Sequence, residues 1–282
     1  MPLTSPWPPR AWVPKWGTSP GWATTSSAGP SCGCGNTRVC SPVTYRWLGT
    51  SPRASTSCVR RKGHEPSHAY YRAGSAASRL SAREVPVEAV EGARLLHTSG
   101  ISQATSASAR EAVCWAMERA RRKGVVVSYD LNVRPKLLPV ERFRVLVLET
   151  LPLVDLAFLS TEDARYVLGD RHETETLQAV VDAGMRVAVL KCAERGCVVA
   201  TAEGERLTVP AWPVHAVGPT GAGDAFDAAF VVEWLAGRSL EEVARFANAV
   251  GALVTPGVGA TTALPTREQV EGFLARHTGR EA

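Results

Sequence analysis

The chain has 282 residues, enough for one large domain or two smaller ones with a buried core. Apolar residues make up 45% of it and charged residues 21%, which is ordinary for a globular protein and excludes collagen-like and wholly disordered classes. We find no apolar run near the roughly 18 residues of a membrane span and no signal-peptide pattern, and seven cysteines are an odd and small number for a secreted disulfide scaffold. We therefore expect a cytoplasmic protein.

The first 64 residues differ in composition from the rest. Residues 1–64 contain no Asp or Glu, but hold eight Lys or Arg, 9 of the 19 prolines and 5 of the 8 tryptophans. Residues 65–282 carry 24 basic and 27 acidic side chains, a net of −3, so the formal charge of +5 arises entirely in the first segment. The charge of the larger part gives no indication of a nucleic-acid or membrane partner.

Three interpretations of residues 1–64 stay open. The Pro, Ser and Gly content suits a disordered basic arm, although five tryptophans are unusual for one. Cys32, Cys34, Cys40 and Cys58 match a zinc site only weakly, because no Cys-x-x-Cys pair occurs. The third interpretation is translation in a shifted frame that returns between about Arg60 and Ala69, since shifted codons permit amphipathic sequences with acidic residues restored. We expect an anomalous segment over 1–64 and a domain over 65–282.

From residue 69 onward, apolar periodicity predicts alternating strands and helices. The expected strands lie at 70–72, 93–98, 125–130, 154–159, 187–191, 197–200 and 207–209. The expected helices lie at 106–123, 139–150, 173–183, 222–237, 239–254 and 266–277. A further helix follows Ser160, which would cap it together with Asp163 three residues on. This alternation predicts a mainly parallel sheet with helices on both faces and ligands at the carboxyl ends of its strands.

The strongest chemical signal is the segment Pro-Thr-Gly-Ala-Gly-Asp-Ala-Phe over 219–226. Its glycines would let the backbone approach an anion, toward which the helix that begins there directs free N–H groups. Asp224 beside such a site would accept the proton of a hydroxyl that attacks phosphorus, which suits phosphoryl transfer. The alternative interpretation is a glycine-rich loop with an acid at a helix start. The segment is neither a Walker loop nor a dinucleotide fingerprint.

The run Thr220-Gly221-Ala222-Gly223-Asp224 with Phe226 resembles the C-terminal signature of the ribokinase-like (PfkB) family of sugar kinases. Tyr70 to Ala76 resembles the 2-keto-3-deoxygluconate kinase branch of that family. The resemblance covers about 69–277 and implies a ribokinase-like three-layer α/β sandwich, whose N-terminal part and small β-lid we expect to be incomplete. The supporting matches are Asp130-x-Asn132-x-Arg134, Lys191-x-x-x-x-Gly196, and Asn248 ahead of Gly257-x-Gly259-Ala260.

The resemblance implies roles in binding sugar and transferring phosphate. Asp224 would be the general base on the primary hydroxyl of the sugar. Tyr70 and Arg72, on one face of a strand by its period of two, would hold a sugar acid, with Arg72 pairing with its carboxylate. Arg134 would lie near the sugar or the ATP phosphates. The backbone anion hole for the transferred phosphate would comprise Gly221, Ala222 and Gly223.

The resemblance also implies a nucleotide site. Asp163 stands where the family usually has a Glu that organises Mg²⁺ through water. The ATP-binding residues would be Asn132, Ser160, Lys191, Gly196, Thr220, Asn248 and Gly257. Each assignment has a structural alternative: Arg72 as a surface side chain, Asn248 as a polar residue inside a helix, and Ser160 as a simple helix cap.

The chain departs from the family pattern at several points. Gly218 stands where the family usually has an Asp that orders a monovalent-cation loop, which argues against K⁺ activation. Ala193 replaces a common Gly. The family's N-terminal strand and its Gly-Gly sugar-binding loop are not found, so we predict that the chain as written is poorly active or inactive.

The predicted function is ATP- and Mg²⁺-dependent phosphorylation of a sugar acid, 2-keto-3-deoxygluconate, to its 6-phosphate. The alternatives are a PfkB kinase for fructose, ribose or a nucleoside, and a non-catalytic kinase remnant whose basic arm contacts nucleic acid. The pair Tyr70 and Arg72 favours an acid, because a neutral sugar needs no carboxylate partner. The expected partners are therefore a sugar acid and ATP, with no nucleic acid and no membrane, and a homo-oligomer stays open. Cys114, Cys192 and Cys197 fit reduced intracellular thiols.

Overall fold

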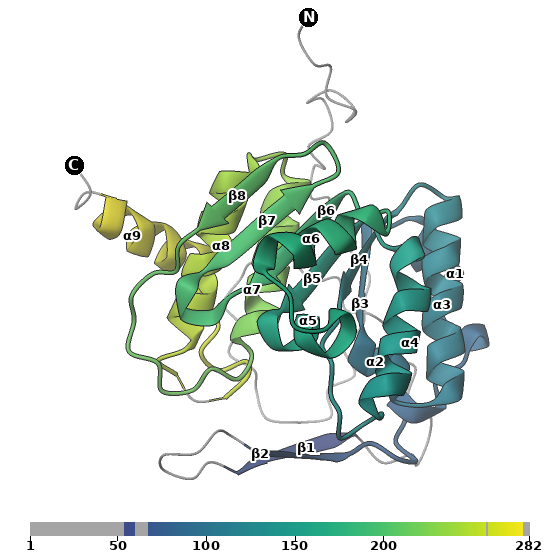
Figure 1. Cartoon of the computed structure of the whole chain (residues 1–282). Coiled ribbons are helices and arrows are strands. Elements are labelled where there is room, and N and C mark those ends of the chain that lie inside the picture. The colour runs from purple at the N-terminus through teal and green to yellow at the C-terminus, as the bar shows by residue number, and fades with distance from the viewer. Residues whose placement is uncertain (1–53, 60–66, 258, 279–282) are drawn as a thin grey trace, which may run out of the picture. The chain divides into compact units, whose positions relative to one another are not determined.

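A six-stranded sheet is the centre of the chain as the structure, a computed structural model, describes it (Figure 1). The described residues are 54–59, 67–257 and 259–278, all within a compact unit that spans 48–282. The strand order is β3-β4-β5-β6-β7-β8; β3 to β6 pair in parallel, and β7 pairs antiparallel with both β6 and β8. The strands are β1 (Ser55–Val59), β2 (Ser67–Tyr71), β3 (Leu95–Ser99), β4 (Val126–Asp130), β5 (Leu156–Ser160), β6 (Val187–Lys191), β7 (Cys197–Thr201) and β8 (Arg206–Val209).

Helices cover both faces of this sheet, as the alternation of strands and helices predicts (Figure 1). The 3₁₀ helices are η1 (Ala77–Arg79), η2 (Ala82–Glu84), η3 (Leu151–Leu153) and η4 (Ala193–Arg195). The α-helices are α1 (Val87–Glu91), α2 (Gly100–Ala104), α3 (Ala107–Arg122), α4 (Val140–Thr150), α5 (Thr161–Leu168), α6 (Glu173–Asp182), α7 (Ala222–Leu235), α8 (Leu240–Val254) and α9 (Arg267–Thr278). No helix in these described ranges has the length and apolarity needed to cross a bilayer.

The side chains of β5 show how the layers are built. Leu156 and Phe158 pack into a buried cluster with residues of α7 and α8. Ala157 and Leu159 point to the opposite face and pack into the larger cluster that includes α3, α4, α5 and α6. Successive residues of a strand face opposite sides of a sheet, so a strand buried on both faces is apolar throughout. The three-layer α/β sandwich predicted from the sequence is therefore confirmed.

The N-terminal hairpin contains the largest difference from the predicted elements. Strand β1 pairs antiparallel with β2, Ser55 opposite Tyr71, although residues 55–59 belong to the segment expected to be anomalous. The short helices α1 and α2 were not predicted, because five residues carry too little periodicity to identify a helix. The cysteines at 32, 34 and 40, and most of the segment to which the shifted-frame interpretation applies, lie outside the described residues.

Candidate active site

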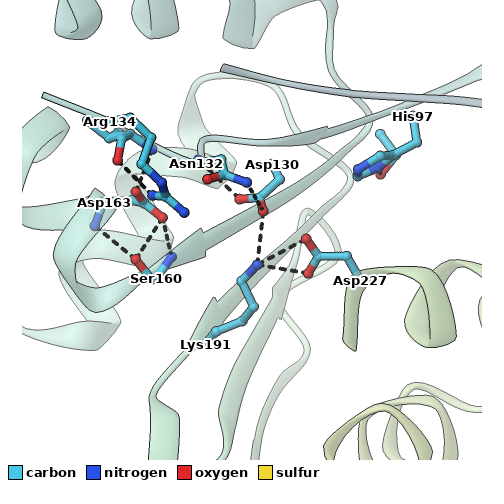
Figure 2. A network of polar contacts seen from close by, with 10 residues as sticks. His97, Asp130, Asn132, Arg134, Ser160, Asp163, Lys191 and Asp227 are labelled. Carbon is cyan, nitrogen blue, oxygen red and sulfur yellow. Dashed lines mark hydrogen bonds and ion pairs between the residues drawn. The ribbon is translucent and has the colours of Figure 1, made fainter. Parts of the chain in front are cut away.

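The carboxyl ends of three neighbouring parallel strands bring the last residues of β4, β5 and β6 to one edge of the sheet. These residues are Asp130, Ser160 and Lys191 (Figure 2). The N-terminus of α7 lies at the same edge, beside Lys191. Ligands of open α/β sheets bind in this position, as the sequence analysis predicts.

A lysine held between two carboxylates forms the core of the site (Figure 2). Lys191 Nζ lies 3.1 Å from Asp130 Oδ2, and 2.9 and 3.0 Å from the two carboxylate oxygens of Asp227. The side chains of Asp130 and Asp227 are only 5% and 3% exposed, and that of Lys191 is 16% exposed. One ammonium group is therefore paired with two buried carboxylates. We call these three residues the charged cluster.

The pKa values in the charged cluster follow from this shortage of cations. Burial lowers the pKa of Lys191, but the two carboxylates outweigh that effect and the net pKa is raised, so the amine stays protonated. Burial raises the pKa of Asp227 well above its usual range, opposed by Lys191 and reinforced by Asp130. Burial acts the same way on Asp130, but there the attraction to Lys191 prevails and the pKa is lowered. Asp130 is thus the ionised partner, and Asp227 takes up a proton more readily.

The loop after β4 turns back onto Asp130. Asn132 adopts a left-handed conformation with φ of 41°, which Asn tolerates better than most residues. Its backbone N–H donates to Asp130 Oδ1 at 3.2 Å, and its side-chain amide donates to Oδ2 at 3.4 Å. The other end of this amide, Asn132 Oδ1, is buried and has no hydrogen-bond partner among the described residues. A buried acceptor without a donor indicates a place for a ligand or water.

The predicted cap of α5 is confirmed. Ser160 Oγ accepts from the N–H of Asp163 at 3.0 Å, and Asp163 Oδ2 accepts from the N–H and the hydroxyl of Ser160 at 3.0 and 2.7 Å. The other oxygen of Asp163 accepts from the N–H of Val133 at 2.7 Å. Burial raises the pKa of Asp163, Asp130 adds to that shift, and the hydrogen bonds from Ser160 oppose it.

Arg134 belongs to the same loop. Its Nη1 donates to the carbonyl of Val133 at 2.8 Å, and the N–H of the same Val133 donates to Asp163. Asp163 thus holds the loop that carries Asn132 and Arg134 through Oδ1, and caps α5 through Oδ2 (Figure 2). The metal role of Asp163 and the sugar or phosphate role of Arg134 stay predictions.

The N-terminus of α7 is the predicted anion-binding segment. Gly221 caps the helix with φ of 88°, and a Cβ at that position would lie 2.6 Å from the carbonyl oxygen of Ala260, so only glycine fits. A Cβ on Gly223 would lie 3.7 Å from Lys191 Nζ, which places the first turn of α7 beside the charged cluster. Asp224 is exposed in this first turn, and Asp227 is buried one turn further on. The N–H of Ala222 donates to the carbonyl of Pro219 at 3.1 Å, so an exposed acid and the N–H groups of Gly223 and Asp224 lie next to a fixed ammonium group.

His97 is a further neighbour of the site. Its Nδ1 lies 3.0 Å from Ser128 Oγ, on the strand that ends at Asp130. Desolvation lowers the pKa of His97, and the charges of Asp130 and Asp224 oppose that shift, which couples this ring to both acids. Neither His97 nor Asp227 was predicted from the sequence as a site residue. Asp227 had a detectable signal, since it is an acid within the otherwise apolar run 225–230.

Two predicted nucleotide-binding residues meet at the end of β8. Asn248 of α8 is buried, and its side-chain amide donates to the carbonyls of Val209 and Pro210, both at 3.1 Å. Gly196, at the end of η4, has φ of 96°, and a Cβ there would lie 2.1 Å from the same Val209 oxygen. The structure thus joins the η4 loop, β8 and α8.

The remaining predicted residues lie on the loops around α7 and α8. Thr220 is exposed and precedes Gly221, the N-cap of α7. The N–H of Gly257 donates to the carbonyl of Val254 at 3.1 Å, and that of Gly218 donates to Thr255 at 2.7 Å. The segment before α7 is therefore bound to the end of α8. Their nucleotide and cation roles stay predictions.

The predicted sugar-acid residues lie together at the end of β2. The guanidinium carbon of Arg72 is 5.8 Å from the centroid of the Tyr70 ring, a cation–π contact. Arg72 Nε is buried and has no hydrogen-bond partner among the described residues. A buried donor without an acceptor costs free energy unless a ligand or water supplies the acceptor.

Comparison with known proteins places this architecture and site in a family. The model of the pfkB family of carbohydrate kinases matches residues 45–267, most of the chain. The chain belongs to this family. The match begins at residue 45, whereas the resemblance found in the sequence begins at about residue 69. The match therefore includes strand β1.

Named relatives differ in the sugars they use. The chain is 30% identical to a 2-dehydro-3-deoxygluconokinase of Bacillus subtilis, over 76% of the chain and 66% of the relative, and 31% identical to a probable fructokinase-4 of Arabidopsis thaliana, over 76% and 68%. A fructokinase of Vibrio cholerae, solved with fructose, ADP and calcium bound, superposes with a TM-score of 0.68 at 26% identity, over 74% of this chain and 68% of that one. The chain thus spans about two thirds of the length of these relatives.

Proposed function

We propose that this chain transfers the terminal phosphoryl group of ATP to the primary hydroxyl of a sugar acid, 2-keto-3-deoxygluconate. The observation that carries the proposal is the first turn of α7, where Asp224 follows Gly223, and a Cβ on Gly223 would lie 3.7 Å from Lys191 Nζ. Membership of a carbohydrate kinase family supports phosphoryl transfer to a sugar. The relatives named 2-dehydro-3-deoxygluconokinase support a sugar acid as the substrate, and the fructokinases support the alternative of a neutral sugar.

The chain's own groups account for the transfer step. The sugar hydroxyl oxygen bonds to the γ-phosphorus while the bond to the β–γ bridging oxygen breaks, and the hydroxyl proton passes to the carboxylate of Asp224. The free N–H groups at the start of α7 stabilise the charge on the transferring oxygens. Lys191 adds a fixed positive charge, because Asp130 and Asp227 hold its ammonium group in place.

Residues of the site also fit a divalent cation bound with ATP. Mg²⁺ usually keeps several waters and binds through one or two protein oxygens and the substrate phosphates, so a dedicated cluster of acids is not required. Asn132 Oδ1 is a buried oxygen to which no described residue donates, and it would accept from the water shell of such an ion. Bound Mg²⁺ would neutralise charge on the phosphates. Asp163, with both oxygens engaged by protein donors, would act by holding the loop of Asn132.

Arg72 favours an acid over a neutral sugar. Its buried Nε lacks an acceptor among the described residues, and a substrate carboxylate would provide one with opposite charge. Substitution Arg72→Gln should therefore raise KM for 2-keto-3-deoxygluconate far more than KM for fructose. Equal effects on both substrates would favour the neutral-sugar alternative.

The test of the transfer step is steady-state kinetics of the purified chain with ATP and each sugar, together with equilibrium binding of ATP. Asp224→Asn should lower kcat about 10²- to 10⁴-fold, because a general base contributes that much. Glu241→Gln is the matched control, since Glu241 is likewise an exposed acid in the first turn of a helix, α8. Similar losses of kcat in both variants would mean that Asp224 acts only through its favourable charge at a helix N-terminus, and not as a general base. ATP binding without turnover would support the non-catalytic remnant, consistent with the low activity predicted from the sequence.

A further inference from the structure

A cavity of about 180 Å³ lies on the opposite side of the sheet edge from the charged cluster. One wall is Leu190, whose neighbour Lys191 faces the other side, as alternate residues of a strand do. The other walls come from α5, α6, the loop between them and η4. The lining residues are Thr161, Ala164, Arg165, Gly169, Asp170, Arg171, Glu173, Thr176, Leu190 and Arg195.

Three arginines line this cavity. Two of them, Arg165 and Arg171, contact other described residues through Nε only. Arg165 Nε lies 3.7 Å from Asp170, in a pair whose side chains are 70% and 91% exposed. Arg171 Nε donates to the carbonyl of Leu168 at 3.0 Å. Exposed ion pairs at such distances are weak, so the terminal nitrogens of both guanidinium groups are available to a ligand.

The third arginine is held more firmly. Arg195 Nη1 lies 2.5 Å from Glu173 Oε1, and the thiol of Cys192 lies 3.7 Å from the same oxygen. Glu173 and Asp170 offset two of the three positive charges, which leaves one net positive charge on the lining residues. The cavity therefore attracts an anion. The carboxylates of Asp170 and Glu173 would repel an anion that is large or highly charged.

We propose that this cavity binds a small anion that carries a phosphate group. Guanidinium groups match the oxygens of phosphate in geometry and charge, and the hydroxyls of Thr161 and Thr176 offer further hydrogen bonds. The volume is below the roughly 300–1,000 Å³ of pockets for drug-sized ligands, so inorganic phosphate or a small phosphate ester fits better than a nucleotide.

The position of the cavity connects such a ligand with the candidate active site. Arg195 belongs to η4, which lies between Lys191 and Gly196, and Thr161 follows Ser160 directly. A bound anion that draws Arg195 away from Glu173 would move η4 and so alter ATP binding. This coupling rests on the proposed function, whereas the binding of the anion does not.

The experiment is a calorimetric titration of the full chain with inorganic phosphate and, separately, with methyl phosphate. Wild type should show saturable binding that weakens at least tenfold in the double variant R165Q/R171Q. The control is R142Q/R144Q, which removes two exposed arginines from α4 and should bind as wild type does. Tighter binding of methyl phosphate would assign the site to a phosphate ester, and tighter binding of phosphate would assign it to the free ion.

Two results would overturn the proposal: no saturable binding to wild type, or equal affinity in wild type and R165Q/R171Q. A parallel titration in the presence of a saturating non-hydrolysable ATP analogue with Mg²⁺ separates the cavity from the anion hole at α7, because the terminal phosphate of the analogue occupies only the latter. The KM for ATP with and without phosphate tests the coupling. A folded chain that lacks kinase activity but loses phosphate binding in R165Q/R171Q would support the anion site and contradict the proposed function alone.

Discussion

Tyr129 and Asp130 are adjacent on β4, but their side chains enter two different polar clusters on opposite faces of the sheet. Tyr129 donates its hydroxyl proton to Gln103 Oε1 at 2.7 Å, and the amide of Gln103 donates to Thr150 Oγ1 at 3.0 Å. Thr150 in turn donates to the carbonyl of Leu146 at 2.8 Å. This neutral cluster ties α2 and α4 to the sheet.

The two clusters differ in charge and in how completely their groups are paired. Tyr129, Gln103 and Thr150 are nearly inaccessible to solvent, and their polar atoms have partners inside the protein. The charged cluster has one cation for two acids, and the neighbouring Asn132 Oδ1 has no partner among the described residues. A satisfied neutral network fixes packing, whereas an unbalanced charged one beside free helix N–H groups is suited to binding an ion. Four predictions test this contrast.

The largest effect on stability is expected from Lys191→Met. Removing the ammonium group leaves Asp130 and Asp227 buried without a cation, and breaking one side of a buried ion pair costs about 3–5 kcal/mol. Urea unfolding at pH 7 measures the loss. The double variant K191M/D227N should recover part of it, and a double variant as unstable as the single one would mean that Asp227 is not the uncompensated charge.

Tyr129→Phe tests the neutral cluster. The variant leaves Gln103 Oε1 without its main donor, and we expect a loss of about 1–3 kcal/mol in the free energy of unfolding. Kinase kinetics and ATP affinity should not change, because the cluster lies on the face away from α7. A fall in ATP affinity without a fall in stability would contradict the structural role assigned to this cluster.

Alkaline pH should act on both clusters, because burial also raises the pKa of Tyr129, and a comparison of wild type with Lys191→Met isolates the part due to the charged cluster. The pKa of Lys191 is raised above its ordinary value of 10.5, so the unfolded chain releases this proton first. The stabilisation is complete below about pH 10.5 and is lost as the pH rises above it, by up to about 1.4 kcal/mol per pH unit. Unfolding free energies at several pH values should show this slope in wild type, and parallel slopes in wild type and Lys191→Met would refute it.

The smallest effect is expected from Ser160→Ala, at the junction of β5 and α5. The loss of the cap should cost about 0.5–2 kcal/mol, because Asp163 loses its hydroxyl partner and its backbone N–H loses an acceptor. Thermal unfolding measures that cost. A rise in the KM for ATP would support the predicted contact of Ser160 with the nucleotide. An unchanged KM would mean that Ser160 acts only as a helix cap.

The sequence was sufficient for features that depend on local pattern. The predicted strand over 187–191 coincides with β6, and the cap formed by Ser160 and Asp163 is present in both directions. The start of α7 at Ala222 follows from the glycines before it. These features depend on residues within a few positions of one another, where periodicity and capping chemistry apply.

The charged cluster could not be derived in the same way. The acid at 227 stands out in an apolar run, but only the fold brings Lys191 to it, and His97 is simply a polar residue in a short predicted strand. Strand β1 was missed because its segment has few apolar residues and its pairing with β2 is not visible in a single strand. Pairing across the sheet is a property of the whole chain, which local pattern does not contain.

The separation of the charged cluster along the chain has a consequence for the order of folding. Lys191 joins Asp130 across 61 positions and Asp227 across 36, whereas Ser160 and Asp163 are three apart. Contacts between distant positions require loop closure before they contribute, so they form late. On refolding from urea, the helical signal should therefore return before nucleotide binding, and the interval between them is the time in which the strands that carry the site find their neighbours.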